Sequence, residues 1–361
     1  MQTKLIIEQH FHGCFGVDFN KATVEDVLYL SKEILKYGIG GIFPTLVTDS
    51  VENIKRATAV IKEAASRQTT GMAKILGIHL EGIFINPEKK GIHNPVHFML
   101  PTIENYKLVE DDFIKIVTLA PDLIPDTESQ RGKEAESISN PSPQRGEGVA
   151  ERRVRGYENL ISYLRSKNVK VQAGHCVGGD LAGCTGVTHL FNAMSGVAHR
   201  GETTALSALV EDEIYTEIIG DGIHVSDKAL ELVFKTKPID KVLLISDSLP
   251  CTDYPRHLRE GKQLLASPAS DRDAGEGKVF EFTFADEKVY YDGVKATSKE
   301  GTIAGSTTMI PKIIKRLKNV GLVDDNQISQ LIQNTYDYHN IDLKGYIEWD
   351  KNCDIITVHS R

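Results

Sequence analysis

Residues 23–45, TVEDVLYLSKEILKYGIGGIFPT, place a helical pattern directly before a strand-like run. Thr23 followed by Asp26 is the signature of a capping box at a helix start, and Gly38 is typical of the position just beyond a helix end. The segment that follows, GIGGIFPT, is short and apolar, which predicts a buried strand. A helix leading into such a strand indicates an α/β protein, because helices are the usual connections between parallel strands.

The same unit recurs along the chain. Eight runs qualify as strands by length and β-branched content. They are KLIIE (4–8), GIGGIFPT (38–45), KILGIHL (74–80), FIKIVTLA (113–120), VKVQAGH (169–175), GVTHLFN (186–192), YTEIIGDG (215–222) and KVLLISDS (241–248). Further helical patterns lie at 53–67, 156–167 and 226–236. Eight alternating units predict a (β/α)8 TIM-type barrel, with a doubly wound open sheet as the alternative.

Two kinds of segment depart from this alternation. Residues 126–155 are polar and hold few branched apolar side chains, so we expect a disordered insertion there. Residues 278–300 and 345–360 alternate and turn like β-hairpins. The expected organisation is a barrel over 1–335 with a hairpin excursion at 278–300, followed over 336–361 by the C-terminal strands of a small β appendage.

Composition excludes several classes of protein. The 361 residues carry a formal charge of −8 with both signs mixed, so no basic face indicates a nucleic-acid partner. The five cysteines form no CxxC pair, which is typical of reduced thiols in a cytosol. The chain starts with no cationic leader and holds no apolar stretch near the roughly 18 residues of a membrane span. We expect a soluble cytoplasmic protein with no membrane partner.

Six polar side chains fall at the carboxyl ends of the predicted strands, where barrel enzymes build their sites. His10 and His12 share a face because residues two apart in a strand point the same way. Imidazoles and a carboxylate are ligands for zinc or a similar ion. The candidate set is His10, His12, Glu81, His175, His189 and Asp247. His79 is expected to be structural.

The polar motifs resemble, in order and spacing, those of the N-acetylglucosamine-6-phosphate deacetylase family in the amidohydrolase superfamily. The motifs are HLEGIFINPEKKGIHNP (79–95), AGH (173–175), THLFNAM (188–194), DGIHV (221–225), ISDS (245–248) and TIAGSTTM (302–309). The resemblance implies metal-dependent hydrolysis of the acetamide of N-acetylglucosamine 6-phosphate by a metal-activated water. It also implies a homodimer, and a phosphorylated amino sugar as the small-molecule partner.

The resemblance also implies a role for each matching position. Glu81, His175 and His189 fall on the principal metal ligands, and His10 and His12 on a pair that binds a second ion in some members. One or two divalent ions are therefore implied, zinc first, with iron or another ion as the alternative. Asp247 falls on the catalytic aspartate, acting as general base and acid. The substrate-binding positions are Ile92, His93, Asn192, Ala193, Arg200, Asp221, His224, Ile303, Ala304 and Gly305.

Arg200 offers a planar fork for the sugar phosphate, aided by His224. The fourth predicted strand ends TLAPD without a lysine, which disfavours the superfamily members with a carboxylated lysine and leaves Glu81 as the bridging carboxylate. Departures from the family pattern are Ile83 and Ser195, where proline is usual, and SDS at 246–248 in place of TDA. Family members also carry residues before the first barrel strand, so we expect a truncated appendage.

Two other functions remain open at this stage. One is an amidohydrolase acting on a different N-acyl sugar or on a cyclic amide. The other is a barrel that serves as a scaffold without activity, because fold alone does not fix function.

Overall fold

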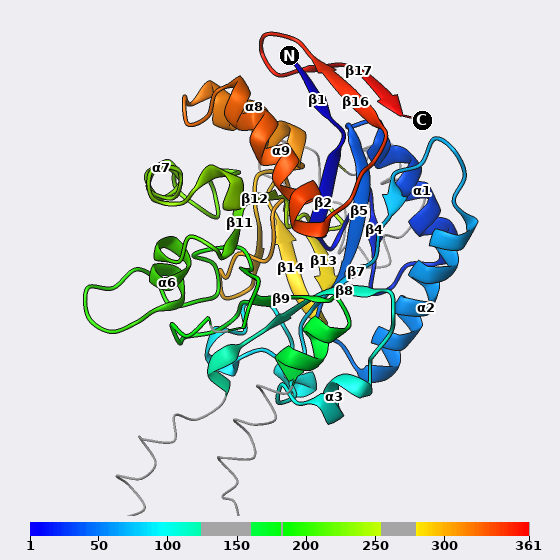
Figure 1. The fold of residues 1–361 in the computed structure, drawn as a ribbon. Coiled ribbons are helices and arrows are strands. Elements are labelled where there is room, and N and C mark those ends of the chain that lie inside the picture. Colours follow the sequence, from blue (N-terminus) through cyan, green and yellow to red (C-terminus); the bar gives the residue numbers. More distant parts are fainter. Residues whose placement is uncertain (124–159, 182, 254–278, 361) are drawn as a thin grey trace, which may run out of the picture.

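The computed structural model describes residues 1–123, 160–181, 183–253 and 279–360. Eight parallel strands follow one another around a single sheet, each hydrogen-bonded to the next in chain order (Figure 1). They are β2 (Ile6–Phe11), β5 (Ile39–Leu46), β7 (Ile78–Glu81), β8 (Ile114–Leu119), β9 (Lys170–Ala173), β10 (Gly186–Val187), β11 (Tyr215–Ile219) and β12 (Val242–Ile245). The short β6 (Lys74–Ile75) pairs with β5 beside this path. Every one of the eight predicted runs is thus a strand of this sheet.

The sheet closes at the carboxyl ends of its first and last strands. Just beyond β12, the Asp247 N–H donates to the carbonyl of His10 at 2.9 Å, and the His12 N–H donates to the carbonyl of Ser248 at 2.9 Å. These bonds join β12 to β2 where a regular ladder is absent from the described strands. The result is a nearly closed barrel, so the alternative of an open doubly wound sheet is wrong.

Helices cover the outside of this barrel, as a parallel sheet requires (Figure 1). Thr23 and Asp26 form the predicted capping box at the start of the first helix, and Gly38 follows it with φ of 76°. Residues 160–166 are helical within the predicted 156–167, whose start lies outside the described residues. The helices are α1 (Val24–Leu35), α2 (Val51–Arg67), α3 (Ile103–Lys107), α6 (Thr204–Val210), α7 (Asp227–Thr236), α8 (Ile310–Asn319) and α9 (Asp325–His339).

Two separate three-stranded sheets accompany the barrel, where the sequence had predicted one small appendage. One contains β13 (Phe280–Phe284), β14 (Glu287–Tyr291) and β15 (Ala296–Ser298). It lies at the carboxyl ends of the barrel strands, because the ring of Phe284 is 5.1 Å from that of His12. A two-stranded ribbon, β3 (Gly13–Cys14) and β4 (Val17–Asp18), follows β2.

The other sheet joins the two ends of the chain (Figure 1). The strand β16 (Gly345–Trp349) pairs with β17 (Ile355–Ser360) on one side and on the other with β1 (Gln2–Lys4), a strand that the sequence analysis missed. The helix α9 continues to His339, so the appendage strands begin at Gly345 and not at 336. The predicted insertion at 126–155 lies outside the described residues.

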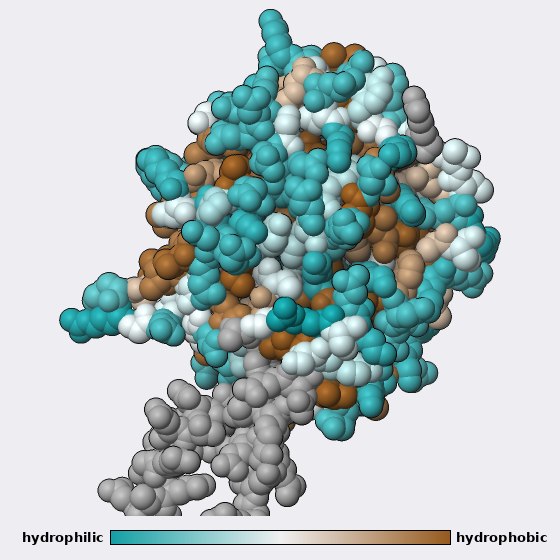
Figure 2. All heavy atoms as spheres, in the orientation of Figure 1, coloured by the Kyte–Doolittle hydropathy of each residue, from teal (hydrophilic) through white to brown (hydrophobic). Residues whose placement is uncertain are grey.

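Most apolar side chains belong to one core that runs between the barrel and its helices. A smaller apolar cluster lies between β13–β15 and the loops at the carboxyl ends, and it includes Val47, Ile92, Leu249, Phe282 and Phe284. On the face shown in Figure 2, hydrophilic side chains predominate and hydrophobic ones gather in smaller areas between them. Among the described helices, none has the length and apolar character that crossing a bilayer demands.

Candidate metal centre

The six side chains predicted at the strand ends come from five strands and are all buried. His10 lies within β2 and His12 directly after it, while Glu81 is the last residue of β7. The other three follow β9, β10 and β12 by two residues and have positive φ, namely His175 (50°), His189 (31°) and Asp247 (52°). Such backbone conformations cost about 1–3 kcal/mol each and are concentrated at functional sites. The fold therefore holds these three side chains in place against local strain.

The carboxylate of Glu81 stands at the centre of this group. Its Oε1 lies 3.1 Å from His175 Nε2 and 2.9 Å from His189 Nε2. Its Oε2 lies 3.2 Å from His10 Nε2 and 3.0 Å from His12 Nε2. Each oxygen thus faces its own pair of imidazoles, an arrangement that suits one carboxylate shared by two ions.

The donor set fits a divalent cation. His175 Nδ1 lies 2.8 Å from the Lys89 carbonyl and His10 Nδ1 lies 2.9 Å from a Glu217 carboxylate oxygen, so both Nδ1 atoms carry hydrogen. In the neutral rings, each Nε2 then turns a lone pair toward Glu81, which is itself an acceptor. Within the described part of the chain, neither His10 Nε2 nor Glu81 Oε2 makes a hydrogen bond. Either protons on the imidazoles or a metal cation between these acceptors satisfies them, and imidazole and carboxylate are ligands of zinc-like ions.

The pKa shifts of the buried histidines and of Glu81 also indicate that this site favours positive charge. Burial alone lowers the pKa of His10, but Glu81 and Glu217 reverse this and raise it well above its ordinary value. Burial likewise opposes ionisation of His12, yet Asp247 and Glu81 raise its pKa to about 9. Burial raises the pKa of Glu81, and the surrounding imidazoles lower it well below its usual range. Protons and a metal ion can both supply this charge, so they compete for the same atoms.

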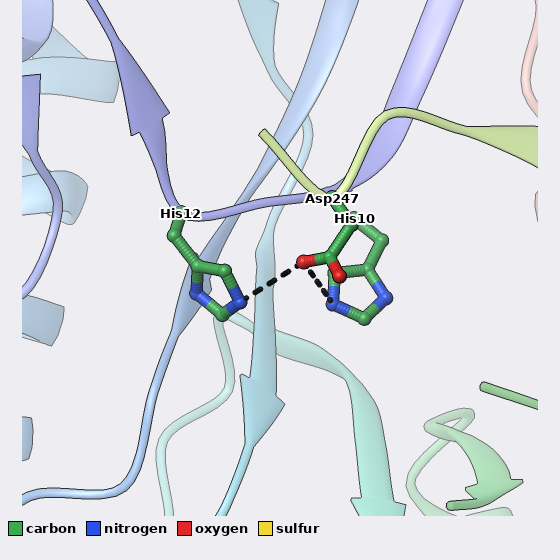
Figure 3. A group of neighbouring side chains, drawn as sticks. All are labelled: His10, His12 and Asp247. Atoms are coloured by element: carbon green, nitrogen blue, oxygen red, sulfur yellow. Dashed lines mark ion pairs between the residues drawn. The ribbon is translucent and has the colours of Figure 1, made fainter. Parts of the chain in front are cut away.

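Asp247 lies beside the half of the site formed by His10 and His12 (Figure 3). Its Oδ1 is 3.3 Å from His12 Nε2 and 3.6 Å from His10 Nε2. Both imidazoles turn toward this carboxylate, which approaches from the segment after β12. A carboxylate in this position can contact an ion and a reacting water at the same time.

The loop after β7 returns His93 to the centre. The ring of His93 lies 4.5 Å from that of His175, and His93 Nε2 is 4.0 Å from Glu81 Oε2. Thr48 Oγ1 accepts the Ile83 N–H at 3.0 Å and lies 2.8 Å from His93 Nδ1. When the Thr48 hydroxyl donates to that nitrogen, the neutral ring presents an N–H at Nε2. Burial and His175 keep the pKa of His93 well below its ordinary value, which favours the neutral ring.

The backbone packed against Gly82, in the HLEG motif, leaves no room for a side chain at this position. Its φ is +144°, and a Cβ there would lie 2.5 Å from the backbone nitrogen of Thr48. We expect Gly82→Ala to destabilise the protein by more than the about 1–3 kcal/mol of backbone strain alone, as measured by denaturant unfolding. Gly71→Ala is the control, because Gly71 has φ of +86° with nothing within 4 Å of its Cβ. Equal losses in the two variants would contradict this account.

The structure brings most of the predicted substrate positions to the same end of the barrel. Gly305 lies against Asp247, whose carbonyl would be 2.7 Å from an added Cβ. Asn192 donates to the His189 carbonyl at 3.3 Å, and the neighbouring Ala193 has φ of 47°. The remaining members of this group are Ile303 and Ala304, which lead into Gly305, and Ile92, which is buried in the smaller apolar cluster.

Asp221 and His224 form a pair, with His224 Nδ1 2.7 Å from Asp221 Oδ2. Ser306 Oγ donates to Asp221 at 2.9 Å, and the Ser306 N–H donates to the Asp247 carbonyl at 2.8 Å. Arg200 is different, because it is exposed on the loop before α6 and makes no hydrogen bond or ion pair to any described residue. No described residue fixes the Arg200 side chain, so its contact with the phosphate stays a prediction.

Two polar residues of the barrel interior were missed by the sequence analysis. Gln9 and Glu217 are fully buried and contact each other and His10 or its neighbours. The available signal was a charged residue in the middle of the apolar run YTEII. His79, by contrast, has both nitrogens occupied, by the Gln9 carbonyl at 3.1 Å and by Thr118 Oγ1 at 2.8 Å, as expected for a structural imidazole.

Known proteins resemble this chain along almost its entire length. The N-acetylglucosamine-6-phosphate deacetylase of Bacillus subtilis is 29% identical over 363 residues, covering 98% of this chain and 80% of the relative. The chain is thus similar to N-acetylglucosamine-6-phosphate deacetylases, an amidohydrolase family. A relative from Escherichia coli O157:H7 with 24% identity, covering 86% of this chain and 70% of its own length, is an N-acetylgalactosamine-6-phosphate deacetylase. No family model matches the chain.

A solved structure agrees on the fold. The N-acetylglucosamine-6-phosphate deacetylase from Thermotoga maritima superposes with a TM-score of 0.77 at 19% sequence identity, covering 99% of this chain and 87% of the other. The chain thus shares the fold of this solved deacetylase.

Proposed function

We propose that this chain hydrolyses the acetamide of N-acetylglucosamine 6-phosphate to glucosamine 6-phosphate and acetate, using one or two divalent ions, zinc in the first place. The observation that carries the proposal is the convergence of four imidazoles on the two oxygens of Glu81 at the mouth of the barrel. The similarity to the Bacillus subtilis deacetylase supplies the substrate.

A divalent ion bound here lowers the pKa of water from about 15.7 to about 7 and polarises an amide carbonyl. Glu81, His175 and His189 would hold one ion, and His10 and His12 would hold a second with the other oxygen of Glu81. None of these proposed ligands is a lysine.

Asp247 is the proposed proton-transfer group. Its carboxylate would take the proton of the attacking water and deliver it to the leaving nitrogen, so that the amine departs neutral. His93 would donate from Nε2 to the carbonyl oxygen as negative charge develops on it. The segments at Asn192–Ala193 and Ile303–Gly305 would orient the sugar.

The sugar phosphate needs a cation, and Arg200 and His224 are the proposed ones. Because Arg200 is exposed in the single chain, its role fits a homodimer in which subunits complete each other's phosphate contacts. A cytoplasmic location is also proposed, supported by five cysteines that are buried and free of disulfides.

The test is acetate release after chelation and restoration of a divalent ion. Activity on N-acetylglucosamine 6-phosphate should depend on the ion, and kcat/KM should fall at least about 10–100-fold without the phosphate, the value of one or two hydrogen bonds to a charged group. N-Acetylgalactosamine 6-phosphate is the competing substrate, since a relative acts on it. Preference for that sugar, or for one without phosphate, would contradict the proposal.

Arg200→Ala should raise KM for the phosphorylated sugar by about 10–100-fold and leave turnover of the unphosphorylated sugar unchanged. The reason is that the substitution removes only the partner of the phosphate. Arg67→Ala on α2 is the matched control, because Arg67 pairs with Glu25 and Glu63 on the surface. Equal KM values for the two variants would mean that Arg200 does not contact the substrate phosphate.

A further inference from the structure

Glu217 is a charged residue in the middle of β11, with an exposed fraction of 0%. It accepts three hydrogen bonds, from Gln9 Nε2 at 2.5 Å, from His10 Nδ1 at 2.9 Å and from the His189 backbone N–H at 3.3 Å. Burying a carboxylate is costly unless its oxygens are satisfied. Two of these donors, His10 and His189, are proposed metal ligands, and Gln9 precedes His10 in the chain. The negative charge of Glu217 therefore lies directly beside the ligands.

The contact with His10 determines what that ring can do. Because a carboxylate only accepts, His10 must carry a hydrogen on Nδ1, and in the neutral ring that can bind a metal its Nε2 is left with a lone pair. That lone pair faces Glu81 Oε2 at 3.2 Å and Asp247 Oδ1 at 3.6 Å. A carboxylate behind a ligating histidine fixes the ring, selects the tautomer and strengthens the ligand.

The network extends away from the site to the last barrel helix. Since the amide nitrogen of Gln9 donates to Glu217, its oxygen is free to accept, and it lies 2.9 Å from His339 Nε2. The His339 ring is held by stacking on Phe43, with centroids 4.4 Å apart. The orientation of His10 is thus supported by a continuous chain of hydrogen bonds that starts on α9 at His339.

We propose that Glu217 is a positioning residue of the metal centre, which holds His10 in the tautomer that binds the second ion. The inference rests on the two-ion centre of the proposed function. Glu217 also contacts the backbone of His189, so it braces one ligand of each half of the site. Neither the apolar run that contains it nor the motifs of the family mark this residue.

The experiment titrates zinc into metal-free wild-type protein and into Glu217→Gln, Glu217→Asp and Thr216→Val, by calorimetry with chelator competition. Glutamine has about the same volume as glutamate but carries no charge. Aspartate is charged, but its shorter side chain holds the carboxylate farther from His10. Thr216→Val is the matched control on the same strand, because the Thr216 hydroxyl has no partner among the described residues. Melting of each metal-free protein is measured in parallel.

The wild type and Thr216→Val should bind two ions with the same affinities. In Glu217→Gln and Glu217→Asp, one ion should bind about 10–100-fold more weakly and the other should change less. Unchanged affinities for both ions, or loss of both ions together with collapse of the metal-free fold, would overturn the inference. Failure of the wild type to bind two ions would instead count against the proposed metal centre, and the comparison would then rest on the affinity of the ion that does bind.

Discussion

Asp247→Asn is expected to lower kcat by about 10²- to 10⁴-fold, because the amide cannot accept the proton of water or return it to the leaving nitrogen. Asparagine has nearly the same size and shape as aspartate, and it tolerates the positive φ of 52° at this position well. Acetate release and metal content should be measured on the same preparation.

The metal content decides how this result is interpreted. Asp247 Oδ1 lies 3.3 Å from His12 Nε2, so a ligand role would show as loss of the ion near His10 and His12. Full metal content with the expected loss of kcat assigns proton transfer to Asp247. A variant with full metal content and nearly full activity would remove Asp247 from the mechanism.

Glu81→Gln is expected to abolish binding of both ions, and its loss of activity should exceed that of Asp247→Asn. Each oxygen of Glu81 faces a different pair of imidazoles, so one substitution removes a shared ligand and its charge. Metal analysis and acetate release after addition of excess zinc measure the effect. Two tightly bound ions in this variant would contradict the bridging role.

The same variant also makes a prediction for the metal-free protein. In the wild type without metal, Glu81 and the surrounding Nε2 atoms bring acceptors together, and protons must be recruited. Glu81 helps to raise the pKa of His12 to about 9 and that of His10 well above its ordinary value, so near pH 7 the protons of these imidazoles pair with its carboxylate. Glutamine removes that charge, so metal-free Glu81→Gln should melt lower than the metal-free wild type near pH 7. An equal melting temperature would mean that these protons contribute nothing to the stability of the metal-free protein.

The barrel could be predicted because its signals are local. Strand runs such as FIKIVTLA and capping pairs such as Thr23 with Asp26 depend on residues close in sequence. Polar residues at strand ends then identify the site, because the carboxyl ends of the strands in a barrel meet at one mouth. The sequence alone therefore predicts that His10, Glu81 and Asp247 lie together.

What escaped prediction depends on long-range pairing. The strand β1 is only three residues long and is defined by its partner β16, with Thr3 opposite Ile347. The division of the β segments into two separate sheets also has no local signal. Glu217 was missed for a similar reason, because its role depends on contacts with Gln9 and His10, which lie about 208 residues away in the chain.

The pairing of β1 with β16 also affects how the chain can be synthesised. The amino group of Met1 donates to the carbonyl of Trp349, a separation of 348 residues. A ribosome therefore releases β1 long before its partner strand exists, and during that interval its edge is available to other chains. Folding of this end must follow translation of β16, so this small sheet closes late.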